Sequence, residues 1–490
     1  MMRSMYSGVS GLRNHQTRMD VIGNNIANVN TAGFKKSRVV FQDTLYQSIK
    51  GASRPDSNRG GTNPMAIGLG MTISSIDQIH TPSPAASTNK LTDMAVDGNG
   101  YFILRSGGQE FYTRNGAFEW DDWGRLVNAQ GYNVLGYMTR IDPTTGEWVL
   151  DTNGDPTDNI DISGFKNIDA QATKRANFGG NVNAELAIPQ VDDGSGTGTT
   201  RSILPQNPEY PGENDDVVIT SREVYDSLGT PVTVYFRFFK YHVDPGVTTN
   251  WACDISLDPN FNNATGYSPS DFADVDLSTG TQASPAPGTL GSSGVDLVRI
   301  YNLKFNQNGA VVDAKDQPWL SQLELTIDRS NAPQDPTGRT AEDIKFTCDF
   351  TALKQFRAES DARISHQDGY SNGSLTSYSV GPDGVITGNF DNGESRALAR
   401  VALAVMANPA GLVQLGNSLY QESPNCGDIK KVAAGNGGTK GIIPGSLEMS
   451  NVDLSEEFTD MIVTQRGFQA NSRIITTSDE MLQELVNLKR

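Results

Sequence analysis

Cysteine is scarce in this 490-residue chain, which has only three. Cys253, Cys348 and Cys426 are widely separated and odd in number, so they cannot form a fully paired disulfide framework. Because free cysteine is among the most frequently buried residue types, we expect each of the three to be a small apolar residue of a protein core.

Histidine is almost as rare, with four in the chain. None of them has a short spacing to another histidine or to a cysteine, so the sequence indicates neither a zinc site nor a Cys/His catalytic pair. His15 falls in a helical pattern and His366 in a polar turn, and we expect both side chains to be exposed to solvent.

Long hydrophobic runs are absent as well. No stretch approaches the roughly 18 consecutive apolar residues that a membrane-spanning helix needs. Residues 5–20 are interrupted by charged and polar side chains, so the N-terminus lacks the apolar core of a cleaved signal peptide. If the protein leaves the cell, we expect it to do so without a cleaved signal.

Positive charge is in deficit, and the formal net charge is −18. This excess of acid excludes nucleic acid and anionic membranes as general partners. The charge is uneven, since residues 1–50 carry seven bases and two acids whereas residues 451–490 carry seven acids and four bases. Opposite signs at the two ends weakly favour contact between them.

No motif for metal or phosphate chemistry is complete. Residues 151–158 begin like a calcium loop, but the sixth position is Pro156 instead of glycine and the twelfth is Ile162 instead of glutamate. The Gly-Asn-Gly sequence at 98–100 is not followed by the Lys-Ser/Thr pair of a phosphate-binding loop. We therefore expect no catalytic residue, no cofactor and no bound metal.

Two amphipathic helices are predicted at the ends of the chain. Met5, Leu12, Met19 and Ile26 recur every seven residues, which is typical of a coiled-coil seam, and Gly33 offers a C-terminal stop. The last segment repeats the pattern, with Asp453 or Ser455 as the helix cap, and the following residues form its stripe: Leu454, Phe458, Met461, Phe468, Ile475, Leu482 and Val486. A core-facing helix of an ordinary globular domain shows the same stripe, but two of them at opposite extremes favour burial of the ends together or against neighbouring molecules.

The residues between these helices indicate short strands. Gly (50) and Pro (23) are frequent, and short apolar runs alternate with Gly, Asn and Asp clusters. We predict a mainly β multidomain protein whose terminal helices form a coiled-coil inner domain, with nested, discontinuous domains. The expected parts are a helical polymerisation domain of 1–35 with 450–490, an extended connector at 36–75 with one strand near 71–79, an inner β domain of 76–174 with 357–449, and one or more outer β domains inserted at 175–356.

Motifs at both ends carry a family resemblance. Residues 5–12 (MYSGVSGL) and 24–35 (NNIANVNTAGFK) resemble the N-terminal signature of bacterial flagellar rod and hook proteins. Residues 450–458 (SNVDLSEEF) and 465–472 (QRGFQANS) resemble the matching C-terminal signature. Interior segments such as 91–102 and 112–118 also resemble the family, whereas 175–356 carries no resemblance.

The resemblance implies a structural subunit of the flagellar hook, the flexible tubular joint that transmits torque from rod to filament, because the related rod proteins are expected to be much shorter. It implies self-assembly into a helical homopolymer, and partners among the rod, hook cap and hook–filament junction proteins. Export through the flagellar type III apparatus to an extracellular location is implied as well. Some similar hook proteins cross-link their subunits through a cysteine, but no lysine partner can be assigned to Cys253 or Cys348.

We expect the polymerisation interface to combine residues of both ends: Met5, Val9, Leu12, Met19, Ile22, Ile26, Asn28, Gly33, Phe34, Leu454, Phe458, Met461, Phe468, Ile475 and Leu482. Three alternatives remain open at this point. A distal rod protein would form a rigid straight polymer, a secreted adhesin would not need two terminal seams, and an enzyme would need a convergent catalytic motif.

Overall fold

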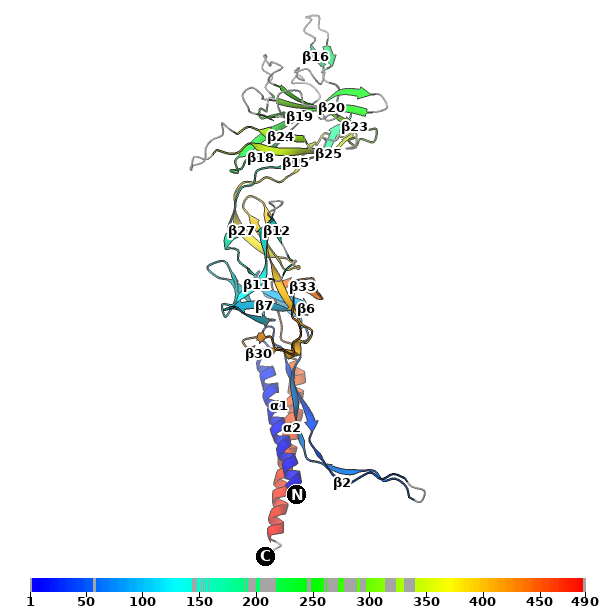
Figure 1. Ribbon diagram of the computed structural model, residues 1–490, viewed down its shortest axis with the longest axis vertical. Helices are drawn as coiled ribbons and strands as arrows, with labels where there is room; N and C mark the ends of the chain where they lie inside the picture. The colour runs from blue at the N-terminus through cyan, green and yellow to red at the C-terminus, as the bar shows by residue number, and fades with distance from the viewer. Residues whose placement is uncertain are drawn as a thin grey trace. The chain divides into compact units, whose positions relative to one another are not determined.

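The computed structural model describes residues 2–487 apart from 56–58, 143–147, 151, 153, 155, 157, 189, 193–199, 203–216, 245–247, 260, 262–271, 277–288, 291–296, 313–322 and 330–339. The fold is mainly β, as predicted, with one long helix at each end of the chain (Figure 1). The chain separates into two compact units, and each is described by itself. Unit 1 comprises 1–166, 376–389 and 395–490, and unit 2 comprises 167–375 and 390–394.

Unit 1 contains both helices, α1 (Met2–Ala27) and α2 (Leu454–Asn487). Its strands before unit 2 are β1 (Ser37–Asp43), β2 (Tyr46–Lys50), β3 (Met65–Gly68), β4 (Met71–Gln78), β5 (Ala85–Ser87), β6 (Met94–Gly98), β7 (Tyr101–Ser106), β8 (Gln109–Thr113), β9 (Phe118–Trp120), β10 (Leu126–Asn128), β11 (Asn133–Ile141), β12 (Trp148–Leu150) and β13 (Asp158–Asn159). Those after it are β28 (Val385–Phe390), β29 (Ser395–Val405), β30 (Val413–Gly416), β31 (Leu419–Gln421), β32 (Lys430–Ala433), β33 (Thr439–Pro444) and β34 (Ser446–Glu448).

Strands from both halves of the sequence share the main sheet of unit 1. β29 pairs with β11 and β7 from the first half and with β28 and β32 from the second. The alternating residues of β7 serve two cores, because Phe102 and Leu104 pack on one face of the sheet and Tyr101 and Ile103 on the other. Burial on both faces explains why this part of the sequence reads as nearly continuous apolar runs.

Unit 2 is a sandwich of two five-stranded sheets. The strands of the sandwich are β15 (Arg175–Asn183), β18 (Val218–Tyr225), β19 (Pro231–Asp244), β20 (Thr248–Ser256), β21 (Phe272–Asp276), β22 (Thr289–Leu290), β23 (Leu297–Phe305), β24 (Leu323–Ile327), β25 (Ile344–Phe356) and β26 (Arg363–Gln367). β16 (Gln190–Asp192) and β17 (Thr200–Ser202) form a separate two-stranded sheet, whereas β14 (Asn167–Ile168) and β27 (Gly373–Val380) belong to the sheet of β28 and β29. The sheet β22-β24-β25-β15-β26 and the sheet β18-β19-β20-β23-β21 share a single core that includes Phe178, Phe236, Phe238 and Phe350.

The three cysteines are free and buried, which confirms the expectation from sequence. Cys253 on β20 and Cys348 on β25 belong to the common core of unit 2, and burial raises the pKa of both thiols. Cys426 lies in a core of unit 1. None of these thiols is accessible at the surface.

The segment after α1 is more structured than predicted. The expected strand near 71–79 is β4, but three further strands precede it: β4 pairs with β1, and β2 pairs with β3. β2 and β3 are exposed and β1 is largely half-buried, and none of the three has the clean alternation of apolar and polar residues that would predict a strand. The candidate calcium loop falls largely outside the described residues, since Asp151, Asn153 and Asp155 are not among them.

No helix in the described part of the chain has the length and apolar character needed to cross a bilayer.

Candidate assembly site: the terminal helices and their junction

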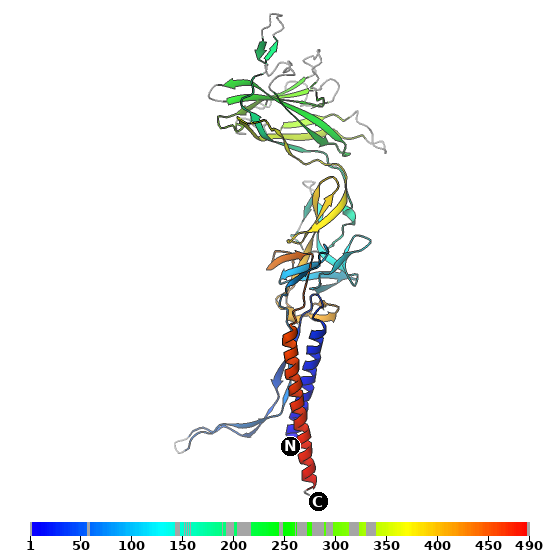
Figure 2. The same ribbon diagram turned by 180° about the vertical axis from the view of Figure 1, so that it is seen from behind.

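α1 and α2 run antiparallel and side by side (Figures 1 and 2). The contacts fix the register, since Gly8 lies opposite Ile475, Gly11 opposite Asn471, and His15 opposite Gly467. Nearer the β domain, Asn25 Nδ2 donates a hydrogen bond to Glu457 Oε2 at 3.2 Å. The two ends of the chain are thus paired along most of the length of α1.

Glycine allows the helices to approach closely at the distal half of this pair. A Cβ atom on Gly11 would lie 2.7 Å from the Asn471 side chain, and one on Gly467 would lie 2.9 Å from the His15 ring. Gly23, by contrast, has open space around it. Glycine destabilises the interior of an isolated helix by about 1 kcal/mol relative to alanine. At Gly11 and Gly467, however, the absence of a Cβ atom allows the two helices to pack closely.

The face of α2 that meets α1 is partly polar. Its buried residues are Glu457, Thr464 and Ser478, which with the half-buried Asn471 recur every seven residues. The predicted positions Met461, Phe468, Ile475 and Leu482 are half-buried beside them. The heptad of the sequence therefore marks only one of the two rows of α2 that pack against α1.

The other interface candidates fall into three groups. Ile22, Gly33 and Phe34 are buried within the single chain, and Met5, Leu12, Met19, Ile26 and Asn28 are half-buried. Val9, Leu454 and Phe458 remain exposed, Phe458 by 50%. Further large apolar side chains on α2, not singled out by the sequence, are also exposed: Ile462, Val463, Ile474 and Met481.

A buried ionic cluster holds the junction between the helices and the β domain. Glu448 Oε1 lies 2.6 Å from Lys35 Nζ, and Glu448 Oε2 lies 3.3 Å from Arg114 NH1, with all three side chains at most 1% exposed. The Ser83 amide also donates to Glu448 at 3.0 Å, and Lys35 Nζ donates to the Thr81 carbonyl at 2.7 Å. Burial lowers the pKa of Lys35 although Glu448 opposes this change.

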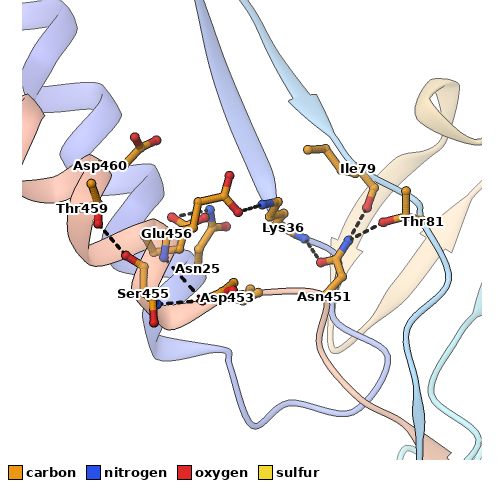
Figure 3. Close-up of polar contacts among 12 residues, drawn as sticks. Asn25, Lys36, Ile79, Thr81, Asn451, Asp453, Ser455, Glu456, Thr459 and Asp460 are labelled. Atoms are coloured by element: carbon orange, nitrogen blue, oxygen red, sulfur yellow. Dashed lines mark hydrogen bonds and ion pairs between the residues drawn. The ribbon is translucent and has the colours of Figure 1, made fainter.

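Residues of the two terminal signatures next to this cluster connect the end of α1 with the start of α2 (Figure 3). The Asn451 side chain accepts a hydrogen bond from the Lys36 amide at 2.6 Å and donates to the Ile79 carbonyl at 2.8 Å. Gly33, whose φ is +68°, donates its amide to the Glu448 carbonyl, and a Cβ at this position would lie 2.7 Å from the Arg114 backbone. The glycine is required here by backbone conformation and by close approach.

The start of α2 was predicted correctly. Asp453 Oδ1 accepts a hydrogen bond from the Ser455 amide at 2.8 Å, so Asp453 is the N-cap. Lys36 Nζ lies 2.8 Å from Glu456 Oε2 in the first turn, and Arg18 pairs with Asp460 at 2.7 Å. We call the whole group the terminal junction: Asn25, Gly33, Lys35, Lys36, Arg114, Glu448, Asn451, Asp453, Glu456 and Glu457.

Two histidines belong to the surroundings of this site. His15 was expected to be exposed, but it is half-buried between Gly467 and Phe41, and burial lowers its pKa. That expectation was wrong because the contact depends on α2, which is remote in sequence. His80 Nδ1 lies 2.7 Å from the Tyr101 hydroxyl, and burial together with Lys35 and Arg114 lowers the pKa of His80 to about 4. His366 is exposed, as expected.

The paired residues of the terminal junction are suited to a structural role. Its charged groups are paired with one another or with backbone atoms, and a hollow of about 130 Å³ beside α1 is lined by side chains such as Arg18, Lys36, Glu456 and Asp460 that already face partners. In the described part of the chain, no group of three or more metal-binding side chains converges. The site holds two helices in a fixed register and presents their outer faces.

Comparison with protein-family models gives four matches along the chain. Residues 5–35 match the model described as "Flagella basal body rod protein", and residues 443–488 match "Flagellar basal body rod FlgEFG protein C-terminal". Residues 95–164 match "Flagellar hook protein FlgE/F/G D1 domain". Residues 197–370 match "Flagellar basal body protein FlaE D2 domain", in the region where the sequence analysis found no resemblance.

Full-length relatives agree with these matches. The chain is 42% identical to the flagellar hook protein FlgE of Borreliella burgdorferi and 37% identical to that of Treponema pallidum, each over 100% of both chains. It is 28% identical to the flagellar basal-body rod protein FlgG of Bacillus subtilis, also over 100% of both chains. The expectation that rod proteins are much shorter than this chain was therefore wrong, because this rod protein matches over its full length. The higher identity to the two hook proteins distinguishes hook from rod instead.

The chain thus belongs to the family of bacterial flagellar hook proteins, structural subunits without enzymatic activity that assemble into the flexible joint transmitting torque from rod to filament.

Proposed function

We propose that this subunit polymerises through its terminal helices, with α1 and α2 forming a coiled-coil inner domain that neighbouring subunits complete. One observation carries the proposal: the contact between α1 and α2 leaves several large apolar side chains of α2 exposed. Phe458, Ile462 and Val463 are each at least 50% exposed. In a homopolymer these side chains can be buried against copies of the same helices, and each buried side chain contributes roughly 1.5 to 3 kcal/mol.

We propose that successive parts of the chain have separate structural roles. Residues 1–35 with 450–490 supply cohesion, residues 36–75 connect, 76–174 with 357–449 form an inner β domain, and 175–356 form an outer domain inserted into it. Support comes from the pairing of β11 with β29, which lie before and after the insert. An insert of this kind keeps both termini in one domain and leaves the outer domain free to change its contacts as the hook bends.

The proposed partners are the other axial components of the flagellum. The tube requires a rod below it, a cap during growth and junction proteins above it, and the subunit requires the flagellar type III apparatus to reach the extracellular side. Support for these partners comes from family membership and from the rod-type models that match both ends. The rod protein that matches the full length is less similar, at 28% identity against 42% for a hook protein, and a straight, rigid polymer would contradict the hook role.

Excision of the outer domain tests the proposal. Gln171 and Tyr370 form an isolated β-bridge with two backbone hydrogen bonds of 3.0 Å, so residues 172–369 can be replaced by a short Gly/Ser linker. This cut also removes β26, which pairs with β15 and lies beyond the expected boundary at 356. We expect the shortened protein to form tubes in electron micrographs, with altered bending stiffness. Failure of the shortened protein to polymerise, when the full chain does, would contradict the assignment of cohesion to the termini.

A further inference from the structure

Several asparagines of the chain are followed directly by glycine, and this dipeptide is chemically labile. The glycine amide nitrogen can attack the Cγ atom of the asparagine side chain, because glycine has no side chain that obstructs the approach. The bond from Cγ to Nδ2 breaks, ammonia leaves and a succinimide ring forms, which water then opens to aspartate or isoaspartate. The asparagines concerned are Asn99, Asn115, Asn153, Asn308, Asn372, Asn392 and Asn436, of which Asn153 lies outside the described residues.

The fold holds two of these side chains away from the attacking nitrogen. Asn115 Oδ1 accepts a hydrogen bond from the Ala117 amide at 3.1 Å. Asn392 Oδ1 accepts from the Glu394 amide at 3.0 Å, and its Nδ2 donates to the Ser371 carbonyl at 2.7 Å. Ring closure at Asn115 or Asn392 must first break these hydrogen bonds, so we expect both to be protected.

Two further dipeptides are restrained through the glycine. The Gly309 amide donates a hydrogen bond to the Asn306 carbonyl at 3.0 Å, so the nitrogen that would attack Asn308 is engaged. Gly373 is buried in β27, where it lies opposite Ile168 of β14. A paired strand cannot turn its peptide plane towards a side chain without losing the pairing.

Asn99 and Asn436 lack both kinds of restraint. Both residues are exposed. In the described part of the chain, neither of their side chains takes part in a hydrogen bond, and neither does the amide of Gly100 or of Gly437. Each turn therefore leaves the reacting carbon and the attacking nitrogen free to meet.

These two turns are neighbours in unit 1. β6 and β33 pair side by side, with Gly98 at the end of β6 opposite Thr439 at the start of β33 (Figure 1). The fold requires the glycine of each dipeptide, since φ is +143° at Gly100 and +63° at Gly437, and a Cβ on Gly437 would lie 2.7 Å from the Val432 side chain. The labile dipeptides thus follow from the turn conformations.

We propose that the two turns at 99–100 and 436–437 are the sites at which the folded chain deamidates, with water as the co-reactant. Each conversion replaces a neutral amide by a carboxylate and adds one negative charge to this end of unit 1. The inference goes beyond the proposed function and does not depend on it, because the reaction uses only atoms of the single chain and water.

Conversion at Asn436 has a structural consequence. The Asn436 carbonyl accepts hydrogen bonds from the Thr439 amide at 3.1 Å and from its hydroxyl at 2.7 Å, and Thr439 is buried. Isoaspartate carries the main chain through the former side chain and so adds a methylene group to the turn. We expect this change to displace the carbonyl, and the Thr439 amide should then exchange its hydrogen faster in the converted chain.

Peptide mapping of the aged full chain tests the assignment. The folded protein is incubated in heavy-oxygen water at mildly alkaline pH, digested, and analysed by mass spectrometry at Asn99, Asn436, Asn115 and Asn392. We expect the first two to convert at least about tenfold faster than the other two, the factor that corresponds to roughly one hydrogen bond. The products should carry one heavy oxygen atom from the water that opened the succinimide.

Two controls separate the fold from the local sequence. In denaturant the hydrogen bonds that protect Asn115 and Asn392 are lost, so all four asparagines should convert at similar rates. Asn436→Gln should stop conversion at 436, because the longer side chain forms a ring less readily, and should leave the rate at Asn99 unchanged.

The remaining outcomes contradict the inference. Conversion of Asn115 or Asn392 in the folded chain as fast as that of Asn99 and Asn436 would show that the fold does not select the site. A folded chain in which Asn99 and Asn436 stay intact while the denatured chain converts would show that both turns are protected. Conversion of only one turn would overturn the assignment of the other.

Discussion

Replacing Glu448 by Gln should lower the free energy of unfolding of unit 1 by about 3 to 5 kcal/mol. The glutamine side chain has nearly the same shape, but it leaves the Lys35 and Arg114 cations without an anion in a site where all three residues are at most 1% exposed. Removing one partner of a buried ion pair costs this much because the remaining charge stays desolvated. Denaturant unfolding of the full chain measures the effect, and the transition of unit 2 serves as the internal reference.

A matched control exists on the surface of the same unit. Lys90 and Glu119 also pair at 2.6 Å, but their side chains are 46% and 74% exposed, so Glu119→Gln should change stability little. If Glu448→Gln is no more destabilising than Glu119→Gln, the ionic cluster does not hold the terminal junction together.

Replacing Ile475 by Asp should raise the protein concentration needed for tube assembly at least about a hundredfold. Ile475 is half-buried against Gly8 of α1, and assembly around the helix pair would enclose an unpaired carboxylate there. Several kcal/mol of desolvation penalty corresponds to more than two factors of ten in affinity. Sedimentation of the polymer measures the loss, and the melting of unit 2 should not move.

Thr476→Asp is the control for this variant. It adds the same charge one residue further along α2, at a position that is exposed in the single chain. Tubes that form from Ile475→Asp as readily as from Thr476→Asp would mean that the α1–α2 contact does not contribute to assembly.

The sequence predicted the helices because their heptads are local patterns. The cap at Asp453 follows from the residue type before the first turn, and the mainly β body follows from short apolar runs between turn residues. The stop at Gly33 was only approximately placed, since α1 ends at Ala27 and turns precede the glycine. Local signals therefore identify the elements better than their limits.

The contacts between distant parts of the chain could not be predicted in this way. Glu448 lies 413 residues from Lys35, and nothing in the sequence near either residue indicates a buried pair. The packing role of Gly8 and Gly11 could not be predicted either, because the value of a missing Cβ appears only when the second helix is in place. The polar row through Thr464 and Ser478 was missed because only apolar residues were used to find the seam.

The account rests on the claim that the terminal helices are completed by neighbouring subunits, and amide hydrogen exchange on monomer and tubes tests it most directly. Helices in proteins owe most of their stability to the packing of an apolar face instead of to intrinsic helix propensity. We expect weak protection of α1 and α2 in dilute monomer, strongest near Asn25 and Glu457 at the terminal junction and fading towards both chain ends, and strong protection throughout in tubes. Equal, strong protection of both helices in dilute monomer and in tubes would show that they form a complete intramolecular core, and would contradict the account.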